Sequence, residues 1–228
     1  MDFFSQPYTA PPEQPSQPQQ QTAYKQPYDP NKYKKPYDPN FKKQFKPKAK
    51  KVPGLPELYK PFALFANNPI PPDIKERAAK VAEILESHGC TLRTDTTTEF
   101  DDIFQSKITR KEIYLPWKGF KDLESSFYFS TDVSKEVAKK YFTKFDEMKD
   151  TVKAFLSRNT RMVLGQEIKS NVSFMIVWTA DGAESKSEKT VKTGLSSHPM
   201  SIAFDIKVPV FNLQRPDVVE RLSKYLEP

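Results

Sequence analysis

Short apolar runs alternate with longer amphipathic stretches from residue 61 to the end of the chain. Five of these runs predict buried strands, because each holds four to seven mainly apolar or β-branched residues. They are residues 62–66, 90–94, 112–115, 173–179 and 208–211. Since helical patterns separate the runs, we expect a mostly parallel sheet with helices on both faces.

One predicted helix has a clear apolar face. It opens at Pro71-Pro72-Asp73, ends at Gly89, and repeats apolar residues at the three-to-four spacing of a helix. These residues are Ile74, Ala78, Val81, Ala82 and Leu85. Further helices are predicted at residues 98–105, 134–164 with a break near 145–150, 200–205 and 216–226. Residues 180–192 form a polar loop.

The first 60 residues differ from the rest in charge and composition. They hold 11 lysines against five acidic residues, whereas residues 61–228 hold 25 basic and 24 acidic side chains. The sequence Pro-Tyr-Asp-Pro-Asn starts at Pro27 and again at Pro36, and two lysines follow each copy. A segment rich in Pro, Gln, Tyr and Lys buries too little apolar surface to offset its ordering entropy. We therefore expect a disordered tail, residues 1–60, before one domain, residues 61–228.

The tail combines lysines with aromatic residues. This composition suits phosphate neutralisation and base stacking, so single-stranded DNA is one expected partner. The alternatives are a solvated tether and a peptide that docks on a protein. The candidate contact residues are Lys25, Tyr28, Lys34, Lys35, Tyr37, Lys42, Lys43 and Lys46.

Several classes of protein and site are disfavoured by composition. A single cysteine, Cys90, excludes an intrachain disulfide and a cysteine-cluster metal site. His88 and His198 lie far apart, which disfavours a histidine zinc site. No apolar run approaches the ~20 residues that span a bilayer, and residues 1–20 lack signal-peptide regions. We expect a cytoplasmic protein with no membrane contact and no bound metal.

Three segments carry a resemblance to a known group. They are Pro71-Pro72-Asp73 to Trp117-Lys118-Gly119-Phe120, Arg158-Asn159 to Val163-Leu164-Gly165, and Phe174 to Leu213, which includes Trp178-Thr179-Ala180-Asp181-Gly182. In order and spacing they resemble the SLOG superfamily, which contains the DprA/Smf DNA-processing proteins and the LOG nucleotide phosphoribohydrolases. The bacterial and phage DprA-like branch is the most similar, with RN-x-x-x-VLG, CWTPDG and IPVFNL at these positions. The resemblance covers residues 62–226 and implies a Rossmann-like fold, nucleotide binding, single-stranded DNA binding and self-association, in a bacterial cell or encoded by a phage.

The chain departs from that group in the loops that hold the ligand. The family's Gly-Ser-Arg turn after the first strand is replaced by Ala66-Asn67-Asn68-Pro69, and its glycine-rich second loop by residues 94–101, which contain no glycine. The third loop, residues 193–199, keeps only Gly194 of three glycines. Such glycines let backbone amides approach a phosphate. Thr96 and Thr97 fill that space and tolerate positive φ badly. We expect an impaired nucleotide site.

Acidic residues cluster beside the expected cleft. Asp95, Glu99, Asp101 and Asp102 suit a general acid/base pair or a hydrated Mg²⁺ ion. The alternative is that they complement the dipole of a helix that Thr98 caps. Asp95, Glu99 and Asp101 are the catalytic candidates if the chain is an enzyme. No cofactor is expected apart from this Mg²⁺ ion.

The remaining site candidates lie near the carboxyl ends of the predicted strands. Open α/β sheets bind ligands at this edge. The ligand-binding candidates are Arg93, Thr94, Trp117, Asp181, Thr193, Gly194 and His198. Trp117 could stack on a base or pack a loop, Asp181 could bind a ligand or form a turn, and His198 could meet a phosphate or lie on the surface.

Three functions remain open from the sequence. The first is a non-enzymatic DprA-like binding or scaffold protein whose tail engages nucleic acid or a protein partner. The second, implied by the resemblance to LOG proteins, is cleavage of a nucleotide N-glycosidic bond. The third is a protein-interaction module that interferes with host nucleotide signalling. The lost glycines favour the first over the second.

Overall fold

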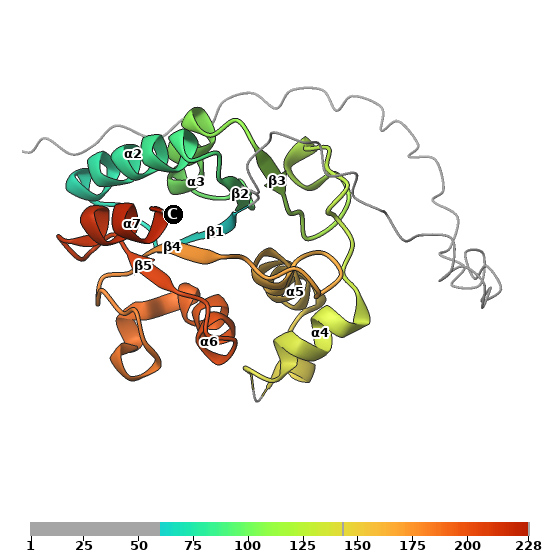
Figure 1. Cartoon of the computed structure of the whole chain (residues 1–228). Helices are drawn as coiled ribbons and strands as arrows, with labels where there is room; N and C mark the ends of the chain where they lie inside the picture. The colour runs from blue at the N-terminus through green and yellow to red at the C-terminus, as the bar shows by residue number, and fades with distance from the viewer. Residues whose placement is uncertain (1–59, 143, 228) are drawn as a thin grey trace, which may run out of the picture. The chain divides into compact units, whose positions relative to one another are not determined.

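The computed structural model describes residues 60–142 and 144–227, which form a Rossmann-like α/β domain (Figure 1). In these residues five parallel strands build one sheet in the order β3-β2-β1-β4-β5. The strands are β1 (Pro61–Ala66), β2 (Thr91–Thr94), β3 (Lys111–Ile113), β4 (Phe174–Trp178) and β5 (Val210–Asn212). The predicted fold class is confirmed. Residues 1–59, with all the tail residues singled out above, lie outside the described residues.

Alternate side chains of each central strand enter two separate apolar layers. Phe62 and Leu64 of β1 enter the layer that α2, α3 and α7 cover, whereas Ala63 and Phe65 enter the layer of α5 and α6. The helices are α2 (Pro72–Ser87), α3 (Glu99–Lys107), α4 (Asp132–Lys139), α5 (Asp150–Leu164), α6 (Ser197–Asp205) and α7 (Val218–Leu226). Burial on both faces explains why the central strands β1 and β4 are apolar runs with no polar alternation, whereas β3 at the sheet edge begins with Lys111 and Glu112.

The predicted long helix over residues 134–164 is interrupted, but the break begins at Lys140, earlier than the predicted 145–150. Helix α4 ends at Lys139 and α5 begins at Asp150, with the short 3₁₀ helix η2 (Phe145–Glu147) between them. Phe145 is buried and fixes this connection. The two helices can therefore change direction, and α4 packs on α5 while α5 lies against the sheet.

The strand order reverses beside β1. The chain builds β1, β2 and β3 toward one edge and then adds β4 and β5 on the other side of β1. In open α/β sheets a crevice forms outside the carboxyl ends of the strands at such a point. The topology therefore predicts a ligand-binding crevice among the segments that follow β1, β2 and β4.

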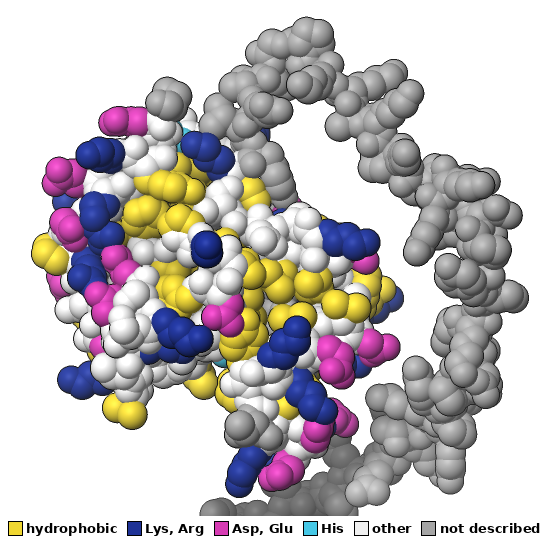
Figure 2. Space-filling model, turned by 60° about the horizontal axis from the view of Figure 1, so that its bottom comes forward, with side chains coloured by type: hydrophobic (Ala, Val, Ile, Leu, Met, Phe, Trp, Pro, Cys, Tyr) yellow, Lys and Arg dark blue, Asp and Glu magenta, His cyan; other side chains and the backbone are white. Residues whose placement is uncertain are grey.

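The surface of the described residues carries both signs of charge. On the face shown in Figure 2, hydrophobic side chains gather in the middle, and basic and acidic side chains are mixed around them. Among residues 60–142 and 144–227 no helix has the length and apolarity needed to cross a bilayer. The same residues contain no group of three His, Cys, Asp or Glu side chains placed to hold a metal ion.

Candidate functional site

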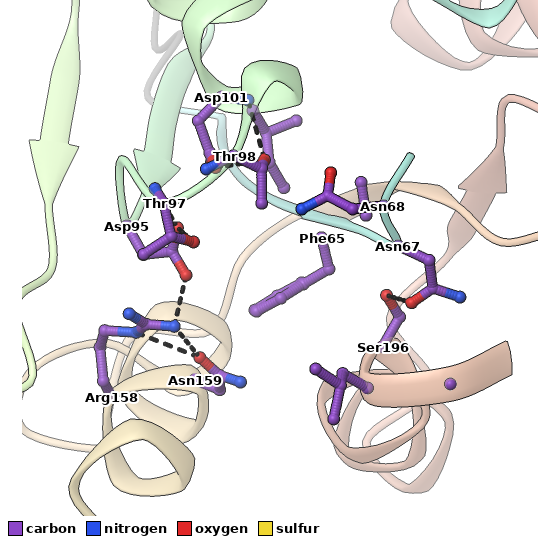
Figure 3. A pocket seen from close by; sticks show the side chains of 14 residues that line it. Phe65, Asn67, Asn68, Asp95, Thr97, Thr98, Asp101, Arg158, Asn159 and Ser196 are labelled. Atoms are coloured by element: carbon purple, nitrogen blue, oxygen red, sulfur yellow. Dashed lines mark hydrogen bonds and ion pairs between the residues drawn. The ribbon is translucent and has the colours of Figure 1, made fainter. Parts of the chain in front are cut away.

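A hollow of about 600 Å³ opens at the carboxyl ends of β1 and β2 (Figure 3). We call it the crevice. Its polar lining comes from five segments: the turn after β1, the loop after β2, the first turn of helix α3, helix α5 and the segment before α6. The polar residues that border it are Asn67, Asn68, Asp95, Thr97, Thr98, Asp101, Arg158, Asn159 and Ser196. The crevice therefore lies where the topology places a ligand.

Asp95 and Arg158 form a buried ion pair in the crevice wall. Arg158 Nη2 contacts Asp95 Oδ2 and also donates to Asn159 Oδ1 at 2.9 Å. The guanidinium lies 5.0 Å from the ring centroid of Phe155. Burial lowers the pKa of Arg158, against the opposing effect of Asp95 and Asp101. Thr97 donates to Asp95 Oδ1 from its backbone N at 3.0 Å and from its hydroxyl at 2.5 Å, so this carboxylate is fixed in place.

Asp101 takes part in the N-terminal cap of α3. Its Oδ2 accepts hydrogen bonds from the backbone N of Thr98 at 2.9 Å and from the Thr98 hydroxyl at 2.6 Å, and its Oδ1 accepts from the Thr94 hydroxyl at 2.6 Å. The backbone N of Asp101 donates in return to Thr98 Oγ1, which completes a capping box. Burial, together with the nearby Asp95 carboxylate, raises the pKa of Asp101 to about 7. The capping role considered for Thr98 is confirmed.

The turn after β1 offers few amides to an anion. Pro69, Pro71 and Pro72 have no N–H, and Pro72 begins α2. The side chain of Asn67 crosses to the segment before α6, where it donates to the carbonyls of Lys192 and Thr193, each at 3.1 Å. Its Oδ1 accepts from the Ser196 hydroxyl at 3.3 Å. The amide of Asn67 thus occupies the space over the one glycine that this loop keeps.

The loop after β2 retains the backbone conformation of a glycine at a threonine. Thr96 has φ of 57°, in the left-handed region that β-branched residues avoid. Among the described residues its hydroxyl has no hydrogen-bond partner. Threonine was expected to tolerate positive φ badly, and Thr96 adopts this conformation, so its backbone is strained.

The structure does not bring all the predicted site residues to the crevice. Arg93 is buried, donates to Glu112 at 2.8 Å and to the Ser170 carbonyl at 2.7 Å, and does not line it. Glu99 is exposed and pairs with Lys75 at 2.6 Å. Thr94 does not line the crevice either, but its hydroxyl donates to Asp101, which does. Trp117 packs against Phe120 and Phe155, outside the crevice lining.

Asp181 organises the loop after β4. Its carboxylate accepts from the hydroxyls of Thr179 at 2.6 Å, Thr193 at 2.5 Å and Thr190 at 2.9 Å. Burial opposes ionisation, but these hydrogen bonds together hold the pKa of Asp181 well below its usual range. Asp181 and Thr193 therefore shape the loop that carries Gly194, which lines the crevice, and His198, which lines a neighbouring hollow.

Sequence reasoning did not single out Arg158, Asn159, Asn67 or Asn68 as site residues. Arg158 and Asn159 served only to support the family resemblance. A signal was present, because an arginine on the apolar side of a helix needs a buried partner. The two asparagines were noted only as replacements for a glycine turn.

Comparisons with known proteins add little to this geometry. No protein-family model matches the chain, and no curated protein matches it. Among solved structures it is similar to DNA processing protein A from Helicobacter pylori, described for its single-stranded DNA binding mode. The TM-score is 0.41 and the identity 16%, over 74% of each chain. That protein is of the DNA-processing group that the sequence resembles, but a similarity at this level does not indicate what the present chain binds.

Proposed function

We propose that this chain is a non-enzymatic binding protein. Its crevice takes a small polar ligand without a phosphate group, such as a nucleoside, and its lysine-rich tail engages single-stranded nucleic acid. One observation carries the first part of the proposal. Each place in the crevice where a Rossmann-like fold would hold a phosphate is closed by the chain's own residues.

Three closures support this statement. Prolines remove the amide donors at the start of α2, Asp101 takes the amide of Thr98 at the start of α3, and Asn67 covers Gly194 before α6. The carboxylates of Asp95 and Asp101 further oppose an anion. A phosphate would therefore meet fewer amide donors than a glycine-rich loop offers, and the guanidinium in the crevice wall, that of Arg158, is already paired with Asp95.

The groups that remain suit a neutral polar ligand. Asn68, Asp95 and Asn159 border one opening, and the ring of Phe65 lies between them (Figure 3). Carboxylate and amide side chains accept and donate hydrogen bonds to hydroxyl groups, and an aromatic floor contacts an apolar ring or sugar face. The volume of about 600 Å³ falls in the range of sites for small molecules.

Thermal unfolding of the full chain with matched nucleosides and 5′-monophosphates tests the proposal. We expect adenosine or guanosine to raise Tm more than AMP or GMP does. A ligand at 100 times its Kd adds about 2.7 kcal/mol, which corresponds to several degrees. Asn159→Ala should reduce the shift, whereas Asn171→Ala, an exposed control, should not. A larger shift with the monophosphates would refute the proposed site.

The second part of the proposal rests on the tail sequence. Eleven lysines against five acidic residues in residues 1–60 contrast with the near balance of the domain. With its tyrosines and phenylalanines, such a segment could neutralise about 5–8 phosphates and stack on bases. The salt dependence of binding is the expected signature.

A second candidate function is hydrolysis of an N-glycosidic bond. It is favoured by the pKa of about 7 that burial and Asp95 give to Asp101, because a carboxyl group that titrates near neutrality can act as an acid or base. Release of free base from a nucleoside, lost in Asp101→Asn and kept in Glu99→Gln, would support this activity. No release by the wild-type chain would leave only the binding function.

A further inference from the structure

A second hollow, of about 830 Å³, lies beside the crevice. We call it the chamber. The two share Thr97, Arg158, Asn159, Gly194 and Leu195 in their walls. The apolar walls of the chamber come from η1 (Phe120–Asp122), α5 and the segment after α4, and its polar end comes from Lys189 and the first turns of α6. The apolar residues that matter below are Phe120, Phe142, Val152, Phe155 and Leu156.

A buried histidine borders this apolar space. His198 is only 4% exposed, and within residues 60–142 and 144–227 neither of its ring nitrogens has a hydrogen-bond partner. Its ring instead contacts two aromatic rings, with centroid distances of 5.8 Å to Tyr141 and 5.2 Å to Phe142. Because a buried polar group without a hydrogen-bond partner destabilises the folded state, a ligand that supplies the missing partner gains binding free energy.

A lysine lies at the same end of the chamber. Lys189 Nζ donates to Ser197 Oγ at 3.0 Å and to Ser201 Oγ, and all three residues line the chamber with His198. Burial, and next the neighbouring Lys186, lower the pKa of Lys189. Among the described residues no carboxylate lies within ion-pair distance of this ammonium group. The end of the chamber near His198 therefore carries an ammonium group that forms no ion pair among the described residues, although Asp205 acts on it from a longer distance.

The protonation of His198 limits the charge of the ligand. Burial, and next Lys189, lower the pKa of His198 to about 4, so the imidazole is neutral at pH 7. A neutral imidazole donates one hydrogen bond and accepts another. Lys121, which also lines the chamber, donates to the Thr96 carbonyl at 3.1 Å. With an ammonium group beside a neutral imidazole and with apolar walls, the end near His198 matches a monoanion better than a phosphate dianion, whose desolvation would cost more.

We propose that the chamber binds a small apolar monocarboxylic acid. Its carboxylate would lie between Lys189 and the imidazole of His198, and its hydrocarbon or aromatic part would lie among Phe120, Phe155 and Leu156. The proposal goes beyond the function of the crevice and does not depend on it, because neither Lys189 nor His198 lines the crevice.

The test uses 1-naphthaleneacetic acid as the probe, with 1-naphthaleneacetamide as its neutral match. Calorimetric titration of the full chain should show one site for the acid. The amide should bind at least about tenfold more weakly, because it lacks the charge-assisted contact with Lys189. Equal affinity for the two compounds, or no binding of the acid, would overturn the proposal.

Matched variants locate the site. Lys189→Met and His198→Leu should each weaken the acid about tenfold or more. Lys192→Met removes the same charge from an exposed position three residues away and should leave the affinity unchanged. Val152 lines the chamber from α5 and is 41% exposed, so Val152→Trp should fill the chamber and abolish binding of both compounds. Thermal unfolding confirms that each variant is folded. An equal loss in Lys192→Met and Lys189→Met would refute the assignment.

Discussion

The side chain of Asn67 lies against Gly194, so that a Cβ atom added to Gly194 would stand 2.9 Å from Asn67 Nδ2. Gly194 has φ of 57° and ψ of −141°, a conformation open in practice only to glycine. In a nucleotide-binding loop a glycine at such a position leaves room for a phosphate. Here the side chain of Asn67 takes that room. This contact joins the turn after β1 to the segment before α6 and closes the crevice on that side.

Replacing Gly194 tests the contact. Gly194→Ala should cost about 2–3 kcal/mol of unfolding free energy, from the positive φ and from the clash with Asn67. Gly119→Ala is the matched control, because Gly119 has φ of 75° with no atom within 4 Å of an added Cβ, and it should cost about 1 kcal/mol. Denaturant unfolding of both variants measures the difference.

A double-mutant cycle separates the clash from the backbone term. If the additional cost of Gly194→Ala comes from Asn67, then Asn67→Ala combined with it should recover that part, with a coupling of about 1 kcal/mol or more. Additive effects of the two substitutions would show that Asn67 does not occupy the space over Gly194.

Thr96 should be a site where glycine stabilises the protein. Thr96→Gly relieves a β-branched residue at positive φ, so the free energy of unfolding should rise by up to about 1 kcal/mol. Thr97→Gly is the control, since Thr97 is not at positive φ and its hydroxyl donates to Asp95 at 2.5 Å. It should lower the stability. A loss of stability in Thr96→Gly would contradict the strained loop.

Asp101 should make the stability of the domain depend on pH between about 4 and 7. Its pKa is raised from an ordinary carboxyl value to about 7 in the folded state, by burial first and by Asp95 next. The folded state therefore binds this proton more tightly, and the resulting stabilisation is complete below pH ~4 and lost as the pH rises through about 7.

The comparison variant isolates this group. The free energy of unfolding of the wild type, relative to Asp101→Asn, should fall as the pH rises from 4 to 7. Asp102→Asn, an exposed neighbour on α3, controls for the loss of one carboxylate at the same end of the helix. Urea unfolding at several pH values provides the measurement. A flat difference for Asp101→Asn would show that folding does not raise the pKa of its carboxyl.

The tail should carry a salt-dependent affinity for single-stranded DNA. Fluorescence anisotropy with a labelled oligonucleotide should give a log–log slope of about 0.7 per phosphate contacted. Replacing Lys34, Lys35, Lys42 and Lys43 by Gln should reduce this slope by up to about 3. Four exposed lysines of the domain, such as Lys80, Lys118, Lys169 and Lys224, provide the matched set. An unchanged slope in the tail variant, with binding to a protein instead, would favour the docking alternative.

The fold was largely predictable from local pattern. The five strands lie within two residues of their predicted positions, and the break in the 134–164 helix was anticipated. Apolar periodicity indicates which face of a helix or strand is buried, so elements can be predicted without knowing what packs against them. The cap of α3 by Thr98 was also visible, because a capping box spans only four residues.

The contacts that define the site were decided by tertiary structure. Asp95 and Arg158 are 63 positions apart in the sequence, and Asn67 and Gly194 are 127 apart, yet each pair meets at the crevice. By itself the sequence determined that the segments after β1 and β2 contain no glycine and that the segment before α6 contains one, Gly194. Which side chains fill the vacated space depends on how β1, α5 and the segment before α6 converge, and crossover connections bring these segments together only in the folded chain.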